Sequence, residues 1–75
     1  MTKKDVLKHG VYRHYKGNYY LVTGTAHHSE TGELLAVYRC LYGDYGLWVR
    51  PLAMFMGTVD IDGAPQARFI FVHET

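Results

Sequence analysis

The stretch NYYLVTGTAHHSETGELLAVYRCLY, residues 18–42, decides the fold class because it reads as two strands joined by a turn. Both halves are rich in β-branched and aromatic residues, which are enriched in strands. Between them, SETGE supplies turn-forming residues, and Thr31-Gly32 is the natural centre of the turn. The sequence therefore predicts one long curved hairpin in the middle of the chain.

The turn position fixes the register of this hairpin, and the register predicts which face is buried. The pairs expected on one largely apolar face are Glu30–Glu33, His28–Leu35, Ala26–Val37, Gly24–Arg39 and Val22–Leu41. This face is expected to form the core. Arg39 does not fit an apolar face, so either its stem passes beside Gly24 towards water, or a bulge at Gly24 shifts the register.

Turn signals on both sides of the hairpin extend the pattern. Residues 10–15 form a strand before a turn at Lys16-Gly17-Asn18, LWVRP (47–51) is a short strand ended by its proline, and ARFIFVH (67–73) is a closing strand. An irregular turn is expected around residues 52–55, followed by a loop that carries Asp60, Asp62, Gly63 and Pro65. The predicted fold is all-β, a small five-stranded SH3-like barrel with one long curved hairpin. An oligonucleotide-binding barrel is the alternative, although its strands normally need a longer chain.

Composition limits the possible classes of protein. The chain has 75 residues, of which 48% are hydrophobic and 15% aromatic, so one small domain is expected. We predict an N-terminal arm over residues 1–9, flexible or a single helical turn, and one β-barrel domain over residues 10–75.

A net charge of +1 does not indicate a general affinity for nucleic acid, although a local basic patch is compatible with it. A single cysteine, Cys40, excludes an intramolecular disulfide and a multi-cysteine zinc site. No apolar stretch resembles a signal peptide or a membrane span, so we expect a cytoplasmic protein without membrane contact.

The segment AHHSETGE (26–33) concentrates groups used in catalysis and in metal binding. Neighbouring strand residues point to opposite faces, so His27 and His28 do not readily share a metal, and His28 and Ser29 do not form a ready base–nucleophile pair. A metal site formed by His14, His28 and Glu30 is a less favoured alternative. We expect Ser29 and Glu30 to organise the turn through side-chain hydrogen bonds, with His28 partly buried.

Aromatic side chains are too numerous for the core of so small a barrel. Several must therefore be exposed, where they stack on bases, grip an extended peptide, or simply cover the ends of the barrel. WVRP places Trp48 and Arg50 two residues apart, on the same strand face. Arg50 is expected to bind an anionic group or to form a structural ion pair with Glu30 or Asp44. DIDG (60–63) lacks the remaining ligands of a calcium loop and is not read as a metal site.

Several blocks match together over about residues 10–71: GVYRHYKGNYYLVTGTAHHSET, VYRCLYG, LWVRPLAMF and ARF. In these blocks the chain resembles a bacterial family known as domain of unknown function 1653. The resemblance implies a small standalone or appended β domain and brings no established activity. Met56 stands where the family commonly has an acidic residue after Met-Phe.

The leading hypothesis is a non-enzymatic binding module for a small anionic or nucleotide-like ligand, or for a single-stranded nucleic acid, with no cofactor and no metal. Convergence of polar groups in an aromatic concavity is typical of a ligand site. The predicted ligand-binding residues are Arg13, His14, Tyr15, His28, Ser29, Glu30, Tyr38, Trp48 and Arg50. The alternatives are a small hydrolase or transferase with His28 as general base and Glu30 orienting it, and a module that binds a protein partner.

Overall fold

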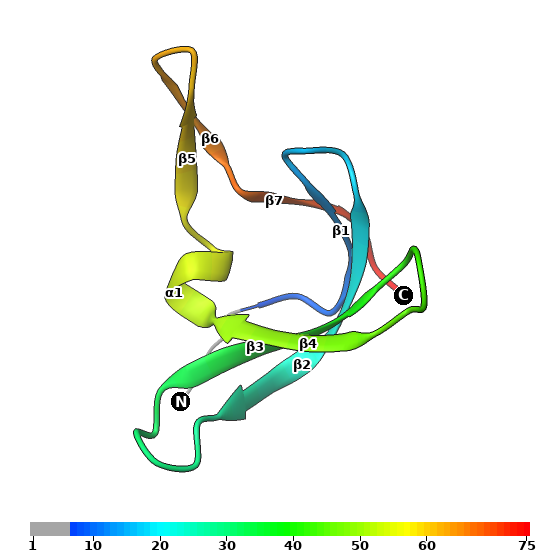
Figure 1. Cartoon of the computed structure of the whole chain (residues 1–75), viewed down its shortest axis with the longest axis vertical. Coiled ribbons are helices and arrows are strands. Elements are labelled where there is room, and N and C mark those ends of the chain that lie inside the picture. Colours follow the sequence, from blue (N-terminus) through cyan, green and yellow to red (C-terminus); the bar gives the residue numbers. More distant parts are fainter. Residues whose placement is uncertain (1–6) are drawn as a thin grey trace.

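The structure, a computed structural model, describes residues 7–75 and contains seven strands and one short helix. The elements are β1 (Gly10–His14), β2 (Tyr19–His27), β3 (Leu34–Cys40), β4 (Leu47–Pro51), α1 (Leu52–Phe55), β5 (Thr58–Ile61), β6 (Ala64–Ala67) and β7 (Phe69–His73). Strands in the order β4-β3-β2-β1-β7 form one antiparallel sheet, and β5 and β6 form a separate hairpin that projects from it (Figure 1). The predicted all-β class is confirmed.

The five expected strands correspond to the five strands of the main sheet. This sheet curls strongly around the core (Figure 1). Within residues 7–75 its two edge strands, β4 and β7, do not pair with each other, so the sheet is not the closed barrel that we expected. The likeness to SH3 domains stays a prediction.

The predicted long hairpin is present as β2 and β3, but the loop that joins the two strands differs from the predicted turn. Residues 29–32 form a loop between β2 and β3, in place of the predicted two-residue turn at Thr31-Gly32. His27 consequently pairs with Leu34, and the register differs by two residues from the prediction. The change comes from the His28 imidazole, which binds backbone amides of the loop and favours a wider connection.

A bulge decides which face of β3 is buried. The ladder is interrupted between Val22 and Gly24, which is one of the two outcomes expected at this glycine. Val22 therefore lies beside Tyr38 on the core face. The buried residues of β3 are Ala36, Tyr38 and Cys40. The predicted core face of this strand, which carried Leu35, Val37, Arg39 and Leu41, is thus wrong, and Arg39 is exposed.

Two segments expected to be irregular have regular structure. Residues 52–55 form α1, and the predicted loop around Asp60 is the β5–β6 hairpin. Asp62 and Gly63 at its turn have φ values of 53° and 81°, the left-handed conformation of a tight hairpin turn. The closing strand is also divided, because Ala67 ends β6 and Phe69 begins β7.

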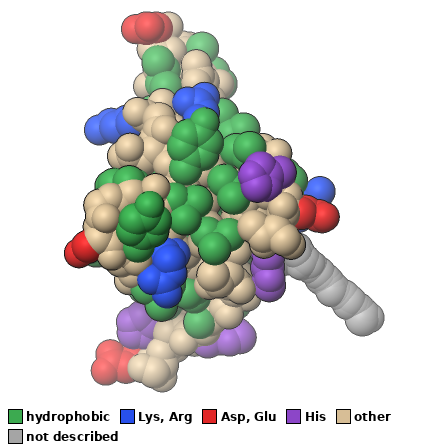
Figure 2. All heavy atoms as spheres, turned by 90° about the vertical axis from the view of Figure 1, so that its right-hand side faces the viewer, with side chains coloured by type: hydrophobic (Ala, Val, Ile, Leu, Met, Phe, Trp, Pro, Cys, Tyr) green, Lys and Arg blue, Asp and Glu red, His purple; other side chains and the backbone are tan. Residues whose placement is uncertain are grey.

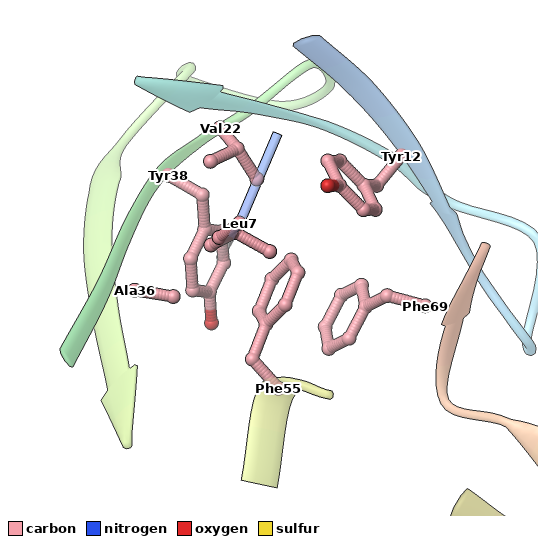
Figure 3. Close-up of a cluster of buried hydrophobic side chains, with 7 residues drawn as sticks. All are labelled: Leu7, Tyr12, Val22, Ala36, Tyr38, Phe55 and Phe69. Atoms are coloured by element: carbon pink, nitrogen blue, oxygen red, sulfur yellow. The ribbon is translucent and has the colours of Figure 1, made fainter. Parts of the chain in front are cut away.

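The core fills the concave face of the main sheet, and α1 closes it from one side (Figure 3). Its buried members are Leu7, Tyr12, Val22, Ala36, Tyr38, Phe55 and Phe69. Phe55 is 1% exposed and stacks on Phe69, with ring centroids 4.0 Å apart and planes 5° apart. A core of mostly aromatic side chains explains how a chain this short buries enough apolar surface.

The predicted N-terminal arm is only partly within the described residues, because residues 1–6 lie outside them. Leu7 belongs to the core, and the Tyr12 hydroxyl donates a 2.8 Å hydrogen bond to the carbonyl of Lys8. The described end of the arm is therefore attached to the domain. Within residues 7–75, no helix is long and apolar enough to cross a membrane.

Candidate functional site

The predicted site residues fall into separate groups. His28, Ser29 and Glu30 lie at the tip of the β2–β3 hairpin, at the bottom of Figure 1. Tyr38, Trp48 and Arg50 lie on the concave face. His14 ends β1 beside Tyr20, at the opposite end of β2 from His28. The eight residue-to-residue steps from Tyr20 to His28 cover roughly 25 Å along the chain, so one pocket cannot hold both histidines.

The hairpin tip is a structural turn. The Nδ1 atom of His28 accepts hydrogen bonds from the backbone amides of Glu30 (3.1 Å) and Thr31 (3.4 Å). The Thr31 hydroxyl accepts one from the amide of Glu33 (3.1 Å). The turn is thus organised by His28 and Thr31, and the prediction that Ser29 and Glu30 do so is wrong. His28 is exposed rather than partly buried.

Arg13 lies on the outer face of the sheet, away from the concave site. Its neighbours in the ladder are Tyr19 and Ile70, both exposed. Since alternate residues of β1 face opposite ways, Tyr12 and His14 point to the concave face and Arg13 does not. The sequence analysis placed Arg13 in the same ligand site as Arg50, and the alternation in β1 separates them.

A pocket opens beside the core on the concave face. Its volume is about 180 Å³, and its lining residues are Tyr20, Tyr38, Cys40, Tyr42, Trp48 and Arg50. The register places Tyr38 opposite Trp48 and Ala36 opposite Arg50, so β3 and β4 present these side chains to the same face. Trp48 is 59% exposed and forms an open wall. Tyr20 and Tyr42 were not predicted for this site, although the aromatic content of the chain was the signal for them.

The guanidinium of Arg50 is held in place by aromatic groups. Its Nε donates a 3.4 Å hydrogen bond to the hydroxyl of Tyr38, and its centre lies 5.7 Å from the centroid of Phe69. The expected ion pair with Glu30 or Asp44 is not formed within residues 7–75, where the contacts of the guanidinium are aromatic. A planar guanidinium has five N–H donors, so several remain for a ligand.

His14 lies next to this pocket, in a positively charged environment. Its ring is 4.4 Å from that of Tyr15 and 4.9 Å from that of Phe69. Its pKa is below the usual value, first because of burial and then because of the positive charges of Arg50, Arg68 and Lys16. The Nδ1 atom accepts the backbone N–H of Lys16 (3.2 Å), which leaves Nε2 for other partners.

Arg68 joins this environment and was not among the predicted site residues. Its backbone is fixed, because its carbonyl accepts the amide of Tyr15 and its amide donates to the carbonyl of Gly57, both at 3.0 Å. Its Nε is buried and has no hydrogen-bond partner within the described part of the chain. Leaving such a group unsatisfied costs about 1–3 kcal/mol or more. The sequence signal was present in the ARF block, where Arg68 precedes a core phenylalanine.

Charged side chains of both signs are spread over the surface. In Figure 2, the lower end carries histidine and carboxylate side chains, carboxylates also lie at the top and at both sides, and basic side chains lie among hydrophobic ones across the middle. Groups of three or more histidine, cysteine or carboxylate side chains placed to hold a metal are absent from residues 7–75. The alternative metal site of His14, His28 and Glu30 is therefore wrong, since its members are far apart.

The hydroxyls of Tyr20 and Tyr42 lie 3.2 Å apart at the pocket rim. This hydrogen bond, followed by one with Cys40, raises the pKa of Tyr42. The raised pKa keeps the Tyr42 phenol neutral near neutral pH. The pocket thus offers aromatic rings, phenol hydroxyls and the cationic side chain of Arg50, and suits a planar ligand that carries negative charge.

Comparisons with known proteins agree with the fold. A family model described as protein of unknown function (DUF1653) matches residues 10–71. A crystal structure of a DUF1653 protein from Bordetella bronchiseptica has a TM-score of 0.83 and 42% sequence identity, and the similarity covers 92% of this chain and 91% of that one. A search of curated proteins finds no match. With most of its residues matched by the family model, the chain belongs to the DUF1653 family.

Proposed function

We propose that the domain is a non-enzymatic binding module for a nucleotide unit, meaning a planar base joined to a phosphate. The observation that carries the proposal is the position of Arg50, which lines a pocket with four aromatic side chains, Tyr20, Tyr38, Tyr42 and Trp48. Base stacking on such rings and a guanidinium contact to phosphate are common in nucleotide recognition.

The size of the pocket favours one ring rather than a large ligand. Its volume of about 180 Å³ is below the range of about 300–1,000 Å³ usual for sites that enclose a drug-sized molecule. The base occupies the pocket beside Trp48, and the sugar and further groups extend outward. Either a free nucleotide or one nucleotide of a single strand meets this requirement.

Two further properties belong to the proposal. A single cysteine, buried at Cys40, is compatible with a reducing compartment and supports a cytoplasmic location. The similarity to the Bordetella protein supports a bacterial origin.

A protein partner is a second candidate function, and one observation favours it. Edge strand β4 exposes three consecutive apolar residues, Leu47, Val49 and Trp48, each more than half exposed. Exposed apolar edge strands pair readily with other chains. Sedimentation velocity over a range of concentrations tests for a second copy of the chain as that partner. A sedimentation coefficient that does not change with concentration counts against self-association.

A backbone-amide NMR titration tests the nucleotide proposal. Ribonucleoside monophosphates and a short single-stranded RNA are added separately at moderate salt. We expect shifts at Trp48 and Tyr42, and the ratio of the two affinities distinguishes a free nucleotide from a strand.

Variants sharpen this test. Arg50→Ala and Trp48→Ala are each expected to weaken binding about tenfold or more, because a charge-assisted hydrogen bond or a stacking contact is lost. Arg39→Ala, on the outer face of β3, removes the same charge and is the matched control. Unchanged affinity in both site variants contradicts the proposal.

A further inference from the structure

Positive charge converges on His14 from separate parts of the chain. Arg50 comes from β4, Arg68 from the link between β6 and β7, and Lys16 from the turn between β1 and β2. Within the described residues 7–75, the charged groups that lower the His14 pKa are these three cations. This cluster adjoins the aromatic pocket because Arg50 belongs to both.

Phe69 sets the spacing within the cluster. The His14 ring packs against its edge at a centroid distance of 4.9 Å, and the Arg50 guanidinium lies 5.7 Å from its centroid. Arg68 directly precedes it and is fixed by backbone hydrogen bonds to Tyr15 and Gly57. The His14 ring and the Arg50 guanidinium are therefore both held against Phe69, and the backbone of Arg68 is fixed next to that residue.

The donors in this cluster are incompletely used. The buried Nε of Arg68 has no partner within residues 7–75. Of the His14 ring atoms, Nδ1 is engaged by the amide of Lys16 and Nε2 is available. Preorganised cationic donors with unmet hydrogen-bonding capacity are what an oxyanion such as phosphate requires.

We propose that His14, Arg50, Arg68 and Lys16 form an oxyanion subsite that takes the phosphate of the bound ligand and couples its binding to protonation of His14 at Nε2. This subsite rests on the proposed function, because it assigns a position in the site to each part of the bound nucleotide. The base occupies the aromatic pocket and the phosphate lies across Arg50 towards Arg68.

The coupling follows from the charges that face the imidazole. In the free protein Lys16, Arg50 and Arg68 oppose protonation of His14, whose ring also lies against the rings of Tyr15 and Tyr20. A bound dianion offsets these positive charges and accepts a hydrogen bond from the protonated Nε2. By linkage, the anion raises the His14 pKa, and lower pH tightens anion binding.

Sulfate is a suitable probe because its charge does not change near neutral pH. Histidine side-chain NMR, recorded across a pH titration of the full chain with and without sulfate, gives the His14 pKa in each state. We expect saturating sulfate to raise it by about one unit, which corresponds to about tenfold tighter sulfate binding to the protonated form. The imidazoles of His27 and His28, at the distant hairpin tip, are internal controls and are expected to titrate alike in both series.

Variants identify the donors. Arg68→Gln and Lys16→Gln are each expected to weaken sulfate binding severalfold to tenfold. Arg39→Gln removes one positive charge from the outer face and is expected to leave the affinity within about twofold at moderate salt. Lys16 is exposed, so its variant remains informative if Arg68→Gln does not fold.

The outcomes separate this proposal from the proposed function. A sulfate-induced rise in the His14 pKa supports the subsite. An unchanged His14 pKa at saturating sulfate overturns it, even where a nucleoside without phosphate still shifts Trp48 and so supports the aromatic pocket. Sulfate binding at His14 without any nucleoside response at Trp48 supports the subsite and contradicts the nucleotide proposal.

Discussion

At the scale of single residues, His14 links the site to the stability of the domain. Its folded-state pKa lies below the unfolded value of 6.5, so the unfolded chain binds more protons at mildly acidic pH. The free energy of unfolding is therefore expected to fall as pH decreases through about 6.5 towards the folded-state pKa. Urea denaturation at a series of pH values measures this dependence.

His14→Asn is expected to reduce that pH dependence, since it removes the titrating group. The same substitution at His28, on the hairpin tip, tests whether loss of any histidine has this effect. A profile for His14→Asn that matches the wild-type profile would mean that another group is responsible.

A second prediction at this scale concerns the close approach of the backbone at Gly10. A side chain here would meet the backbone carbonyl of His73, and the φ of 148° is one that other residues rarely adopt. Gly10→Ala is expected to lower the free energy of unfolding by about 1–3 kcal/mol. Gly17→Ala, at a positive φ in open space, is the comparison and is expected to cost less. Equal losses in thermal or urea unfolding would show that the approach of β7 to Gly10 is unimportant.

At the scale of elements, a helix of a single turn contributes the largest fully buried side chain of the core. The four-residue helix α1 presents Phe55, which stacks on Phe69 and makes an edge contact with Tyr12. Phe55→Ala is expected to lower the free energy of unfolding by about 3–5 kcal/mol. Met54→Ala, on the same turn and 49% exposed, is the matched control with a small expected effect.

Urea unfolding monitored by tyrosine and tryptophan fluorescence measures both variants. A loss for Phe55→Ala as small as that for Met54→Ala would mean that the core can close without the helix. The expected large difference instead identifies α1 as the lid of the core.

The elements also show how far sequence reasoning reaches. Strand propensity and turn residues located all five strands of the main sheet, because these signals are local. The buried face of β3 depended on a bulge at Gly24, whose presence is decided by packing of Val22 beside Tyr38. The Asp62-Gly63 turn was a readable hairpin signal, but the short exposed strands around it lack the apolar alternation that marks a strand.

At the scale of the whole molecule, the long axis separates the hairpin tip from the site. The domain extends 36 Å along this axis, and β2 crosses much of it. His28→Ala is therefore expected to leave nucleotide and sulfate affinity within about twofold of wild type, since screened charges act over about 10 Å. Isothermal titration calorimetry measures both affinities.

His14→Ala serves as the comparison in the same titrations, with weaker sulfate binding expected. If His28→Ala loses as much affinity as His14→Ala, the hairpin tip is not independent of the binding site, and His28 becomes a candidate site residue again. The hydrolase and transferase alternative, which requires His28 as a base, would then need to be reconsidered.

The candidate site was predictable only in part, because some of its residues are close in the sequence and others meet only in the folded chain. Trp48 and Arg50 were correctly grouped because they are two residues apart on one strand. His14 and Arg68 come together only through the pairing of β1 with β7, a contact between chain segments that no local pattern specifies. Arg13 and His14 are neighbours in one block of the family motif, but the alternation of strand residues already implies that their side chains face opposite ways.

The projecting β5–β6 hairpin has a practical consequence. Within the described residues its strands pair only with each other, and its base is narrow, since the amide of Arg68 bonds the carbonyl of Gly57. Residues 58–67 are thus an excursion that leaves the main chain and returns to almost the same point. A fluorescent reporter or an entire second domain inserted between Asp62 and Gly63 would therefore lie outside the main sheet and leave the pairing of its strands undisturbed.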